Sequence, residues 1–415
     1  MKPSDVSVID FFCGCGGSTT AAIKAGGRVT YAINHWTVAI ESHNTNYPNV
    51  EHDCIDVTTV PSNRYPQATI GLFSPECGGH ETASGKKRMV GQLDLFETEQ
   101  QDIGRERSRM TMMEVCRFTE ALNLEIAIVE NVPEVVKWYL FDSWLGEMYK
   151  LGYEHQIVSF NSQFAWPIPQ SRDRIYIIFS KRGNRRPDLE YRPLAYCPKC
   201  KHAVESYQWW KNLRLRVGRY QQQYLYRCST CYEVVRPYAT PAASVIDWSL
   251  DSPRIGDRTK LKKRPLKPAT LRRIALGLQK FGNIPPFLVK YNGKSVASNL
   301  SCAMPTITTV DRCGLVQPPH HFLVQYYGRE DATSSINFPI PTVTTEKRHA
   351  LVHSAIEVED CRFRMLTATE IKMAMGFDQQ YVISGNKRDQ VKQAGNAITP
   401  GAEEWQIRRC IESLS

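Results

Sequence analysis

The sequence VSVIDFFCGCGGSTTAAIK, residues 6–24, joins an apolar strand pattern, a glycine-rich turn and the start of a helix. Val6–Phe12 is the apolar part, and the turn after it carries Gly14, Gly16 and Gly17. Glycines let the backbone approach a ligand closely at the carboxyl edge of a sheet, and a helix N-terminus adds unpaired N–H donors. For this segment alone, two interpretations are open: a site for a nucleotide-like cofactor, or an ordinary tight turn.

The same alternation continues through the first 182 residues. Short apolar segments suited to buried strands are separated by stretches with a helical pattern. The strand segments are Val29–Ile33, Ile70–Phe73, Ile126–Val129 and Ile175–Phe179, and the helical ones are Val38–Asn46, Met110–Leu122 and Trp144–Leu151. This alternation predicts an α/β fold with a mostly parallel, doubly wound sheet.

The composition is that of a basic globular protein. The 415 residues are 42% hydrophobic and 23% charged, and they suffice for two domains or one large domain with an insertion. The net charge of +10, concentrated in stretches such as Lys260–Arg264, favours a polyanionic partner such as nucleic acid. We find no apolar run of 18 residues and no secretory signal, so we expect a cytoplasmic protein without a membrane span, whose 13 cysteines are thiols or metal ligands.

Two reactive side chains follow neighbouring predicted strands. Cys77 comes after Ile70–Phe73, and Glu130 comes after Ile126–Val129. At one edge of a sheet, a cysteine and a carboxylate would form a nucleophile and an acid–base group. Taken singly, each fits a simpler description, an inert buried thiol for Cys77 and a solvated loop acid for Glu130.

Other polar residues lie near the same predicted edge. Arg172 and Arg174 precede Ile175–Phe179, where strand alternation puts both guanidinium groups on one face, suited to a phosphate or a carbonyl oxygen. A solvated edge strand is the alternative. Asn34 ends the second predicted strand, where dinucleotide-binding folds usually place an acid. Asp56 is either an acceptor for an adenine amino group or a helix cap.

In their order along the chain, these segments resemble the motifs of the cytosine-C5 DNA methyltransferase family. The resemblance implies a Rossmann-like, S-adenosylmethionine-dependent methyltransferase fold. It covers residues 5–182 and 361–415, and it leaves the middle third uncovered. The six motifs are Asp10–Gly17, Pro75–Cys77, Glu130–Val132, Gln170–Arg174, Arg364–Glu370 with Met375–Phe377, and Gln393–Ile398.

The resemblance implies methyl transfer to carbon 5 of a cytosine that is flipped out of duplex DNA. Cys77 would add to carbon 6 of the ring, and Glu130 would protonate ring nitrogen N3. Arg172 would assist at the cytosine carbonyl or near the thiolate, and Arg174 would support the loop. The S-adenosylmethionine contacts that the resemblance carries over are Phe12, Gly14, Gly17, Asp56 and Asn396.

Three positions depart from the family's pattern. Glu76 stands where the family usually has proline, Gly78 where it has glutamine, and Asn34 where it has the ribose-binding acid. We expect Asn34 to bond a ribose hydroxyl and Trp36 to stack on the adenine. We also expect Glu76 to point away from Cys77, because a carboxylate facing the sulfur would raise the pKa of the thiol.

The uncovered middle of the chain contains two CxxC pairs that are 27 residues apart. Their four thiols, Cys197, Cys200, Cys228 and Cys231, predict a tetrahedral structural Zn2+ site, as in a zinc ribbon. Two unrelated thiol pairs are the alternative. Aromatic and basic residues lie between the pairs and fit either nucleic-acid contact or packing within the ribbon. They include Tyr207, Trp209, Trp210, Tyr220, Tyr224, Arg214, Arg216 and Arg219.

An internal repeat of about 35 residues follows. Its first copy contains PFLVKYNG and MPTITTVDRCGLV, and its second contains HFLVQYYG and IPTVTTEKRHALV. Two copies are too few for a solenoid, so they predict a duplicated strand–loop unit within one small domain. We expect Arg312, Lys347 and Arg348 in the loops to contact DNA phosphates or guanine edges. Solvated loop charges are the competing interpretation.

The sequence therefore predicts a catalytic domain that is interrupted by an insertion. Residues 1–182 form the S-adenosylmethionine-binding domain, and residues 361–415 complete it. Residues 183–360 form a target-recognition domain with a zinc ribbon (195–233) and the two-copy repeat (286–353). We expect a monomer that binds double-stranded DNA. The alternatives are a methyltransferase of similar fold that acts on cytosine in tRNA, and a catalytically inert DNA-binding protein.

Overall fold

The computed structural model describes eleven segments of the chain. The predictions for Glu76, Cys77, Arg312, Lys347 and Arg348 lie outside the described residues. The chain divides by packing into unit 1 (Met1–Val245, Ala303–Val310 and Ala368–Ser415) and unit 2 (Ile246–Cys302 and Asp311–Thr367). The described segments are 5–75, 111–165, 167–214, 216–281, 286–290, 297–310, 313–317, 322–325, 333–335, 349–352 and 357–415.

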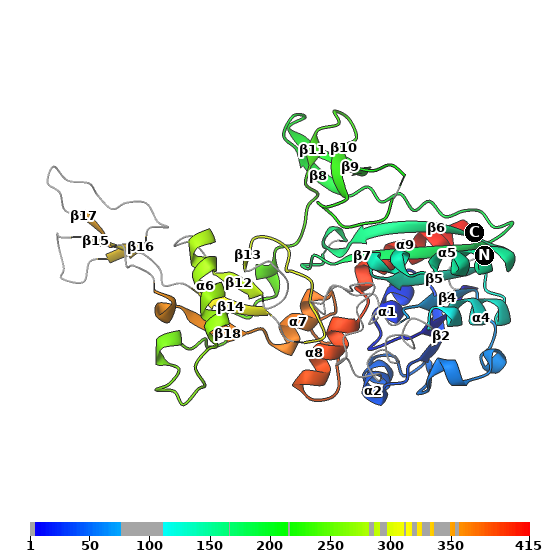
Figure 1. Cartoon of the computed structure of the whole chain (residues 1–415), viewed down its shortest axis with the longest axis horizontal. Helices are drawn as coiled ribbons and strands as arrows, with labels where there is room; N and C mark the ends of the chain where they lie inside the picture. The colour runs from blue at the N-terminus through cyan, green and yellow to red at the C-terminus, as the bar shows by residue number, and fades with distance from the viewer. Residues whose placement is uncertain are drawn as a thin grey trace, which may run out of the picture. The chain divides into compact units, whose positions relative to one another are not determined.

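Unit 1 is built on a seven-stranded sheet with the strand order β3-β2-β1-β4-β5-β7-β6 (Figure 1). The strands from β3 to β5 in this order are parallel, whereas β7 pairs antiparallel with β5 and β6. The predicted α/β fold with a mostly parallel sheet is confirmed. The strands are β1 (Ser7–Phe11), β2 (Arg28–Ile33), β3 (Glu51–Asp53), β4 (Ile70–Phe73), β5 (Ile126–Asn131), β6 (Tyr153–Asn161) and β7 (Asp173–Lys181).

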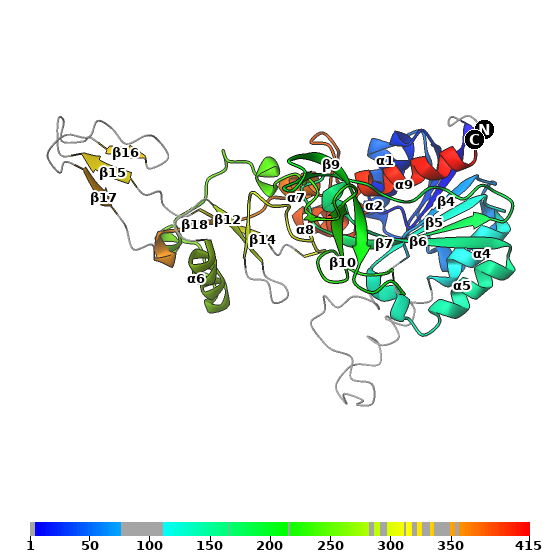
Figure 2. The ribbon, with the colours of Figure 1, turned by 90° about the horizontal axis from the view of Figure 1, so that it is seen from above.

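Helices cover both faces of this sheet. Helices α1 and α9 lie on one side, and α4 and α5 lie on the other (Figure 2). Alternation along β1 sets the two cores, because Val8 packs under α1 and α9 whereas Ile9 and Phe11 pack under α4 and α5. The helices of unit 1 are α1 (Gly17–Lys24), α2 (Thr37–Asn46), α4 (Met113–Ala121), α5 (Phe141–Lys150), α7 (Ala368–Ala374), α8 (Lys387–Asn396) and α9 (Pro400–Ser413).

A second sheet of unit 1 contains both CxxC pairs. Its strands follow the order β11-β10-β9-β8, and we call this sheet with its cysteines the ribbon. Trp210 and Tyr224 are buried in its core together with Tyr226, so packing within the ribbon accounts for these two of the predicted aromatics. The strands are β8 (Leu194–Cys197), β9 (His202–Trp210), β10 (Tyr224–Cys228) and β11 (Val234–Val235).

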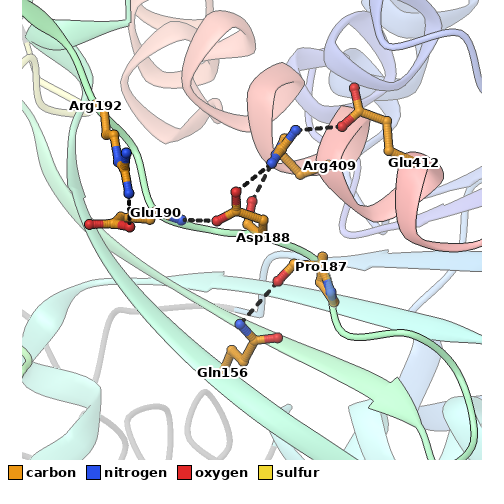
Figure 3. Close-up of polar contacts among 7 residues, drawn as sticks. All are labelled: Gln156, Pro187, Asp188, Glu190, Arg192, Arg409 and Glu412. Carbon is orange, nitrogen blue, oxygen red and sulfur yellow. Dashed lines mark hydrogen bonds and ion pairs between the residues drawn. The ribbon is translucent and has the colours of Figure 1, made fainter. Parts of the chain in front are cut away.

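The linker between β7 and the ribbon is fastened to the last helix of the chain (Figure 3). Arg409 of α9 donates from Nε to the backbone oxygen of Asp188, at 2.8 Å, and from Nη2 to its carboxylate, at 2.7 Å. The same guanidinium pairs with Glu412 at 2.6 Å. A bidentate contact of this kind fixes the linker where it leaves the seven-stranded sheet.

Unit 2 contains helix α6 (Pro268–Phe281) and two small sheets, β13-β12-β14-β18 and β16-β15-β17. The two copies of the repeat form equivalent strands in the same register. Phe287 pairs with Asn299 and Val316, and Phe322 pairs with Ser335 and Val352. The repeat is therefore a duplicated three-stranded unit. The strands are β12 (Phe287–Lys290), β13 (Ala297–Asn299), β14 (Cys313–Gln317), β15 (Phe322–Gln325), β16 (Thr333–Ser335), β17 (His349–Val352) and β18 (Arg362–Met365).

The division into units differs from the predicted domain boundaries. The ribbon and the short segment Ala303–Val310 belong to unit 1 with the seven-stranded sheet, whereas the prediction placed both in the target-recognition domain. The chain returns to unit 1 at Ala368. Among the described residues, no helix is both long enough and apolar enough to cross a membrane.

Candidate active site

The turn between β1 and α1 has the backbone conformation that its glycines permit. Phe12, Gly14 and Gly16 all have positive φ angles, of 62°, 54° and 100°. A Cβ added to Gly14 would meet only the backbone oxygen of Phe12, 4.0 Å away, so this side of the turn has room for a ligand. At Gly17 a Cβ would lie 2.2 Å from the backbone oxygen of Ile398. Gly17 thus allows the segment between α8 and α9 to pack against the start of α1.

The buried side chain of Asp10 binds the first turn of α1, which follows the glycine-rich turn. The Asp10 carboxylate accepts hydrogen bonds from Ser18 Oγ at 2.6 Å and from Thr19 Oγ1 at 2.7 Å. The Thr19 hydroxyl is 2.9 Å from His43 Nε2, and His43 Nδ1 is 2.8 Å from His52 Nε2. Because Thr19 donates to Asp10, His43 Nε2 must donate to Thr19. Burial raises the pKa of Asp10 to about 6, although its bonds to Ser18 and Thr19 lower it.

The predicted cofactor residues at the ends of β2 and β3 make local contacts. Asn34 Oδ1 accepts from the backbone N–H of Trp36 at 2.9 Å. The Trp36 ring has the ammonium group of Lys392, on α8, 4.3 Å from its centroid. Asp56 accepts from the backbone N–H and the hydroxyl of Thr58, at 3.0 and 2.7 Å, which is the helix-cap arrangement. Asn396 is exposed at the end of α8.

The candidate acid Glu130 lies on β5 and forms an ion pair with Arg174 on β7. Glu130 Oε1 is 2.7 Å from Arg174 Nε, and both side chains are largely buried. The next residue, Asn131, donates from Nδ2 to the backbone oxygen of Pro75 at 3.3 Å. The structure therefore brings Glu130, Arg174 and the residue two before Cys77 to one edge of the sheet.

Arg172 contacts a different part of unit 1. Strand β7 begins at Asp173, so strand alternation does not extend to Arg172 and the two arginines have different partners. Arg172 is buried and donates from Nη1 to the backbone oxygen of Ile307 at 3.0 Å. Ile307 belongs to the segment Met304–Thr309 of the first repeat copy, which contains Thr308 and Thr309. That segment also bonds to the motif at Ser171, which donates from its backbone N–H to Met304 O.

The four predicted metal ligands converge at one end of the ribbon. Their sulfur atoms all lie within 4.8 Å of one another, with Cys197 and Cys231 at 3.4 Å and Cys200 and Cys228 at 3.9 Å. A tetrahedral zinc with bonds of about 2.3 Å places its sulfurs roughly 3.8 Å apart, so the cluster fits a metal ion of this size. The residue after each pair, Lys201 or Tyr232, has a positive φ and donates its backbone N–H to the oxygen of the pair's first cysteine.

Some residues near the site were not predicted from the sequence. Glu403 on α9 is fully buried, and neither carboxylate oxygen has a hydrogen-bond partner among the described residues. Burial, reinforced by the negative charges of Asp10 and Glu130, raises its pKa well above the usual range. Nothing in the local sequence signals this burial, because the two other acids of α9 are partly or fully exposed. Arg219 and Tyr220 also contact the catalytic elements, and the mixture of basic and aromatic residues around them was the available signal.

Comparison with known proteins places this geometry in a family context. The sequence family described as "C-5 cytosine-specific DNA methylase" matches residues 6–412. The chain is 22% identical over 183 residues to the type II methyltransferase M.DdeI of Desulfomicrobium norvegicum, and 23% identical over 185 residues to M.HgiDI of Herpetosiphon aurantiacus. These matches cover 42% and 43% of this chain but only 40% and 53% of the two relatives.

Solved structures show the same fold. The Dnmt2 methyltransferase of S. pombe is similar with a TM-score of 0.55 at 14% identity, and the match covers 99% of each chain. A DNMT2 variant from Spodoptera frugiperda is similar with a TM-score of 0.51 at 13% identity, again over 99% of both chains. At this level of identity the likeness concerns the fold alone, and it confirms the expected methyltransferase fold.

Proposed function

Because the chain belongs to the C-5 cytosine-specific DNA methylase family, we propose that it transfers a methyl group from S-adenosylmethionine to carbon 5 of cytosine in duplex DNA. The observation that carries this proposal is the Glu130–Arg174 ion pair, which lies at the same sheet edge as Pro75. The sequence then places Cys77 two residues beyond Pro75. A carboxyl group and a thiol at one edge are the two groups that addition to a pyrimidine ring requires.

The proposed cofactor site fits the residues around the glycine turn. Gly14 leaves room beside the turn, Asn34 Oδ1 is held by the backbone N–H of Trp36, and the Trp36 side chain lies at the start of α2. We assign S-adenosylmethionine contact to these residues together with Phe12, Gly17, Asp56 and Asn396. When bound, S-adenosylmethionine supplies an electrophilic methyl group.

The protein's own groups would then act on the cytosine. The Cys77 thiolate adds to carbon 6 while Glu130 gives a proton to ring nitrogen N3, which leaves carbon 5 electron-rich enough to take the methyl group. Arg174 holds the Glu130 carboxyl toward the ring. Loss of the carbon 5 proton to solvent, departure of the Cys77 sulfur as thiolate and return of the N3 proton to Glu130 restore the aromatic ring. Arg172 acts through the backbone, because its guanidinium fixes the loop at Ile307 beside the catalytic strand.

We also propose that the cysteine cluster holds a structural Zn2+. Four sulfurs within 4.8 Å of one another would fill all four positions of a tetrahedral ion. Such a closed site leaves no position for substrate, so the metal would stabilise the ribbon rather than take part in the reaction. Backbone N–H groups of Cys200, Thr230 and Cys231 point at the sulfurs of Cys197 and Cys228, which helps to stabilise thiolate charge.

Unit 2 supplies the charge that a DNA partner requires. Residues 258–302 contain eleven lysines and arginines and no aspartate or glutamate. Lys260, Lys262, Lys263 and Arg264 are exposed ahead of helix α6, and they precede the duplicated three-stranded unit. Cations that neutralise phosphates provide most of the non-specific affinity for duplex DNA. We therefore assign target recognition to unit 2, with Arg312, Lys347 and Arg348 as its proposed base or phosphate contacts.

The decisive experiment is a covalent trap. Bisulfite sequencing of DNA from cells that express the protein first gives the modified sequence. Duplexes with 5-fluorocytosine at that position, incubated with S-adenosylmethionine, should then form a stable adduct with the wild type and none with Cys77→Ser. Absence of any adduct, with cofactor bound, would establish the inert DNA-binding alternative. Methylation of tRNA but not of DNA would establish the RNA alternative.

A further inference from the structure

The ribbon extends a loop onto the catalytic sheet. This segment, residues 216–220, lies between β9 and β10, and we call it the ribbon loop. Gly218 donates its backbone N–H to Ser159 Oγ on β6, at 3.1 Å, and the Ser159 hydroxyl is 3.4 Å from the backbone oxygen of Arg216. Val217 packs against the hydrophobic core under α4 and α5. The ribbon loop is therefore seated on the catalytic unit and is not a free connection.

Two residues of this loop contact the segments that carry the acid–arginine pair. Arg219 Nη2 is 2.7 Å from Glu134 Oε1, and Glu134 lies in the 3-10 helix Pro133–Lys137 directly after β5. Tyr220 donates its backbone N–H to Asp173 Oδ1 at 3.0 Å. Asp173 is the residue before Arg174, and Asn161 also donates to it, at 2.9 Å. One loop thus touches the strand that carries Arg174 and the segment that follows Glu130.

The ribbon fixes the conformation of this loop. Gln223 Oε1 accepts the backbone N–H of Arg219 at 2.8 Å, and the Tyr220 ring meets the Phe164 ring edge-on at 4.8 Å. Strand β10 begins at Tyr224 and runs without interruption to Cys228. The position of the loop therefore depends on a strand pair whose far end is closed by the cysteine cluster.

We propose that Arg219 is a positioning residue for the Glu130–Arg174 pair, and that the metal-closed ribbon acts in catalysis by holding it there. This inference rests on the proposed function of that pair. Glu134 follows Glu130 in the sequence, and Asp173 precedes Arg174. If the ribbon loop no longer held Glu134 and Asp173, the Glu130 carboxyl and the Arg174 guanidinium would be less firmly positioned. Displacement of a catalytic group by about 1 Å can cost on the order of 100-fold in rate. The competing role for Arg219, contact with DNA phosphate, affects binding and leaves the chemical step intact.

The test compares two substitutions that each remove one positive charge from the same hairpin, together with one that keeps the charge. Arg219→Met removes the contact with Glu134, Arg219→Lys retains a cation, and Arg214→Met is the control, because Arg214 is exposed five positions earlier. Glu134→Gln removes the same contact from the other side. The first measurement is the single-turnover rate of methyl transfer at saturating DNA and S-adenosylmethionine, with the dissociation constants of both. The second is hydrogen exchange of the segments 130–137 and 173–181.

We expect Arg219→Met to lower the single-turnover rate 10- to 100-fold with both dissociation constants within about twofold of wild type. Arg219→Lys should recover part of the rate, and adding Glu134→Gln to Arg219→Met should cost nothing further. Hydrogen exchange of the segments 130–137 and 173–181 should be faster in Arg219→Met than in the wild type. It should also be faster in the wild type after zinc is removed. An unchanged rate overturns the inference, as does a loss confined to DNA affinity. If the wild type transfers no methyl group, the proposed function fails, and unchanged exchange in Arg219→Met would separately overturn the positioning role.

Discussion

Buried ionisable residues around the β1–α1 turn carry information that the sequence motifs do not. Asp10 and Glu403 are both fully buried, and the negative charge of Asp10 adds to the effect of burial in raising the pKa of Glu403. The Thr19 hydroxyl links Asp10 to His43 and through it to His52. Burial raises the pKa of the two carboxyl groups and lowers the pKa of the two imidazoles, so their contributions to stability change with pH in opposite senses.

Glu403 should reduce stability at neutral pH. Burial raises the pKa of Glu403 in the folded protein above its pKa in the unfolded chain. Stability is therefore highest below the unfolded-state pKa, where Glu403 is protonated in both states, and it falls as pH rises toward the folded-state pKa. Glu403→Met removes the charge and the two oxygens that lack partners. We expect it to raise the free energy of unfolding at pH 8 by about 1 kcal/mol or more, with a smaller gain near pH 4.5. Urea denaturation over this pH range measures the difference.

The neighbouring Glu404→Gln is the matched control. Glu404 pairs with Arg408 on the same helix at 2.7 Å and is partly exposed, so its removal should cost under about 1 kcal/mol. A gain for Glu403→Met that is equal at all pH values would show that packing, and not ionisation, is responsible.

His43 should make the fold sensitive to acid. Burial, with a smaller effect of His52, lowers the pKa of His43 from 6.5 to about 3. Between these values the unfolded chain binds more protons than the folded one, so stability falls as pH drops below 6.5, by up to about 1.4 kcal/mol per pH unit. His43→Gln should be less stable at pH 7 but lose less on acidification. The exposed His35→Gln is the control, and parallel curves for wild type and His43→Gln would refute the assignment.

At the scale of elements, the sequence predicted strands more completely than contacts. Ile70–Phe73 was predicted with its observed bounds because all four residues are buried in a parallel sheet. Strand β6 was missed, since it lies at the sheet edge and mixes Glu154, His155 and Gln156 with apolar residues. The pairing of Glu130 with Arg174 could not be predicted, because it depends on β7 running antiparallel beside β5. The cysteine spacing predicted the ribbon itself. The contacts of the ribbon with β6 and β7 could not be predicted, because they join residues that are far apart in the sequence.

The ribbon should contain one zinc ion per chain. Cys200→Ser is expected to lower zinc content in elemental analysis and to reduce the melting temperature, because a closed four-sulfur site stabilises the strands that it joins. Cys302→Ser, outside the cluster, should leave zinc content and melting temperature unchanged. Full zinc content in Cys200→Ser would show that the four thiols are not a single metal site.

At the scale of the whole molecule, the positive charge is concentrated in a segment of the sequence that lies apart from the proposed catalytic residues. The acid-free segment 258–302 carries eleven cations, whereas the net charge of the entire protein is +10. The rest of the chain is therefore close to neutral. This distribution predicts that the affinity for DNA depends on salt mainly through unit 2.

Lys262→Ser combined with Lys263→Ser should weaken binding to any duplex sequence to a similar extent. It should also reduce the slope of log affinity against log salt concentration by up to about 2, since each phosphate contact contributes about 0.9. Lys24→Ser with Lys150→Ser makes the same change in net charge at exposed positions of unit 1. An equal effect of both pairs, measured by fluorescence anisotropy, would argue against a localised DNA contact.

The packing of α9 against α1 joins segments that are far apart in the sequence. Helix α9 shares a hydrophobic core with β1 and α1, and Arg409 binds the linker at Asp188, so one face of the sheet depends on a distant segment for its cover. We therefore expect the separately expressed fragments 1–245 and 368–415 to bind S-adenosylmethionine, the proposed cofactor, only when they are mixed, as isothermal titration calorimetry would measure.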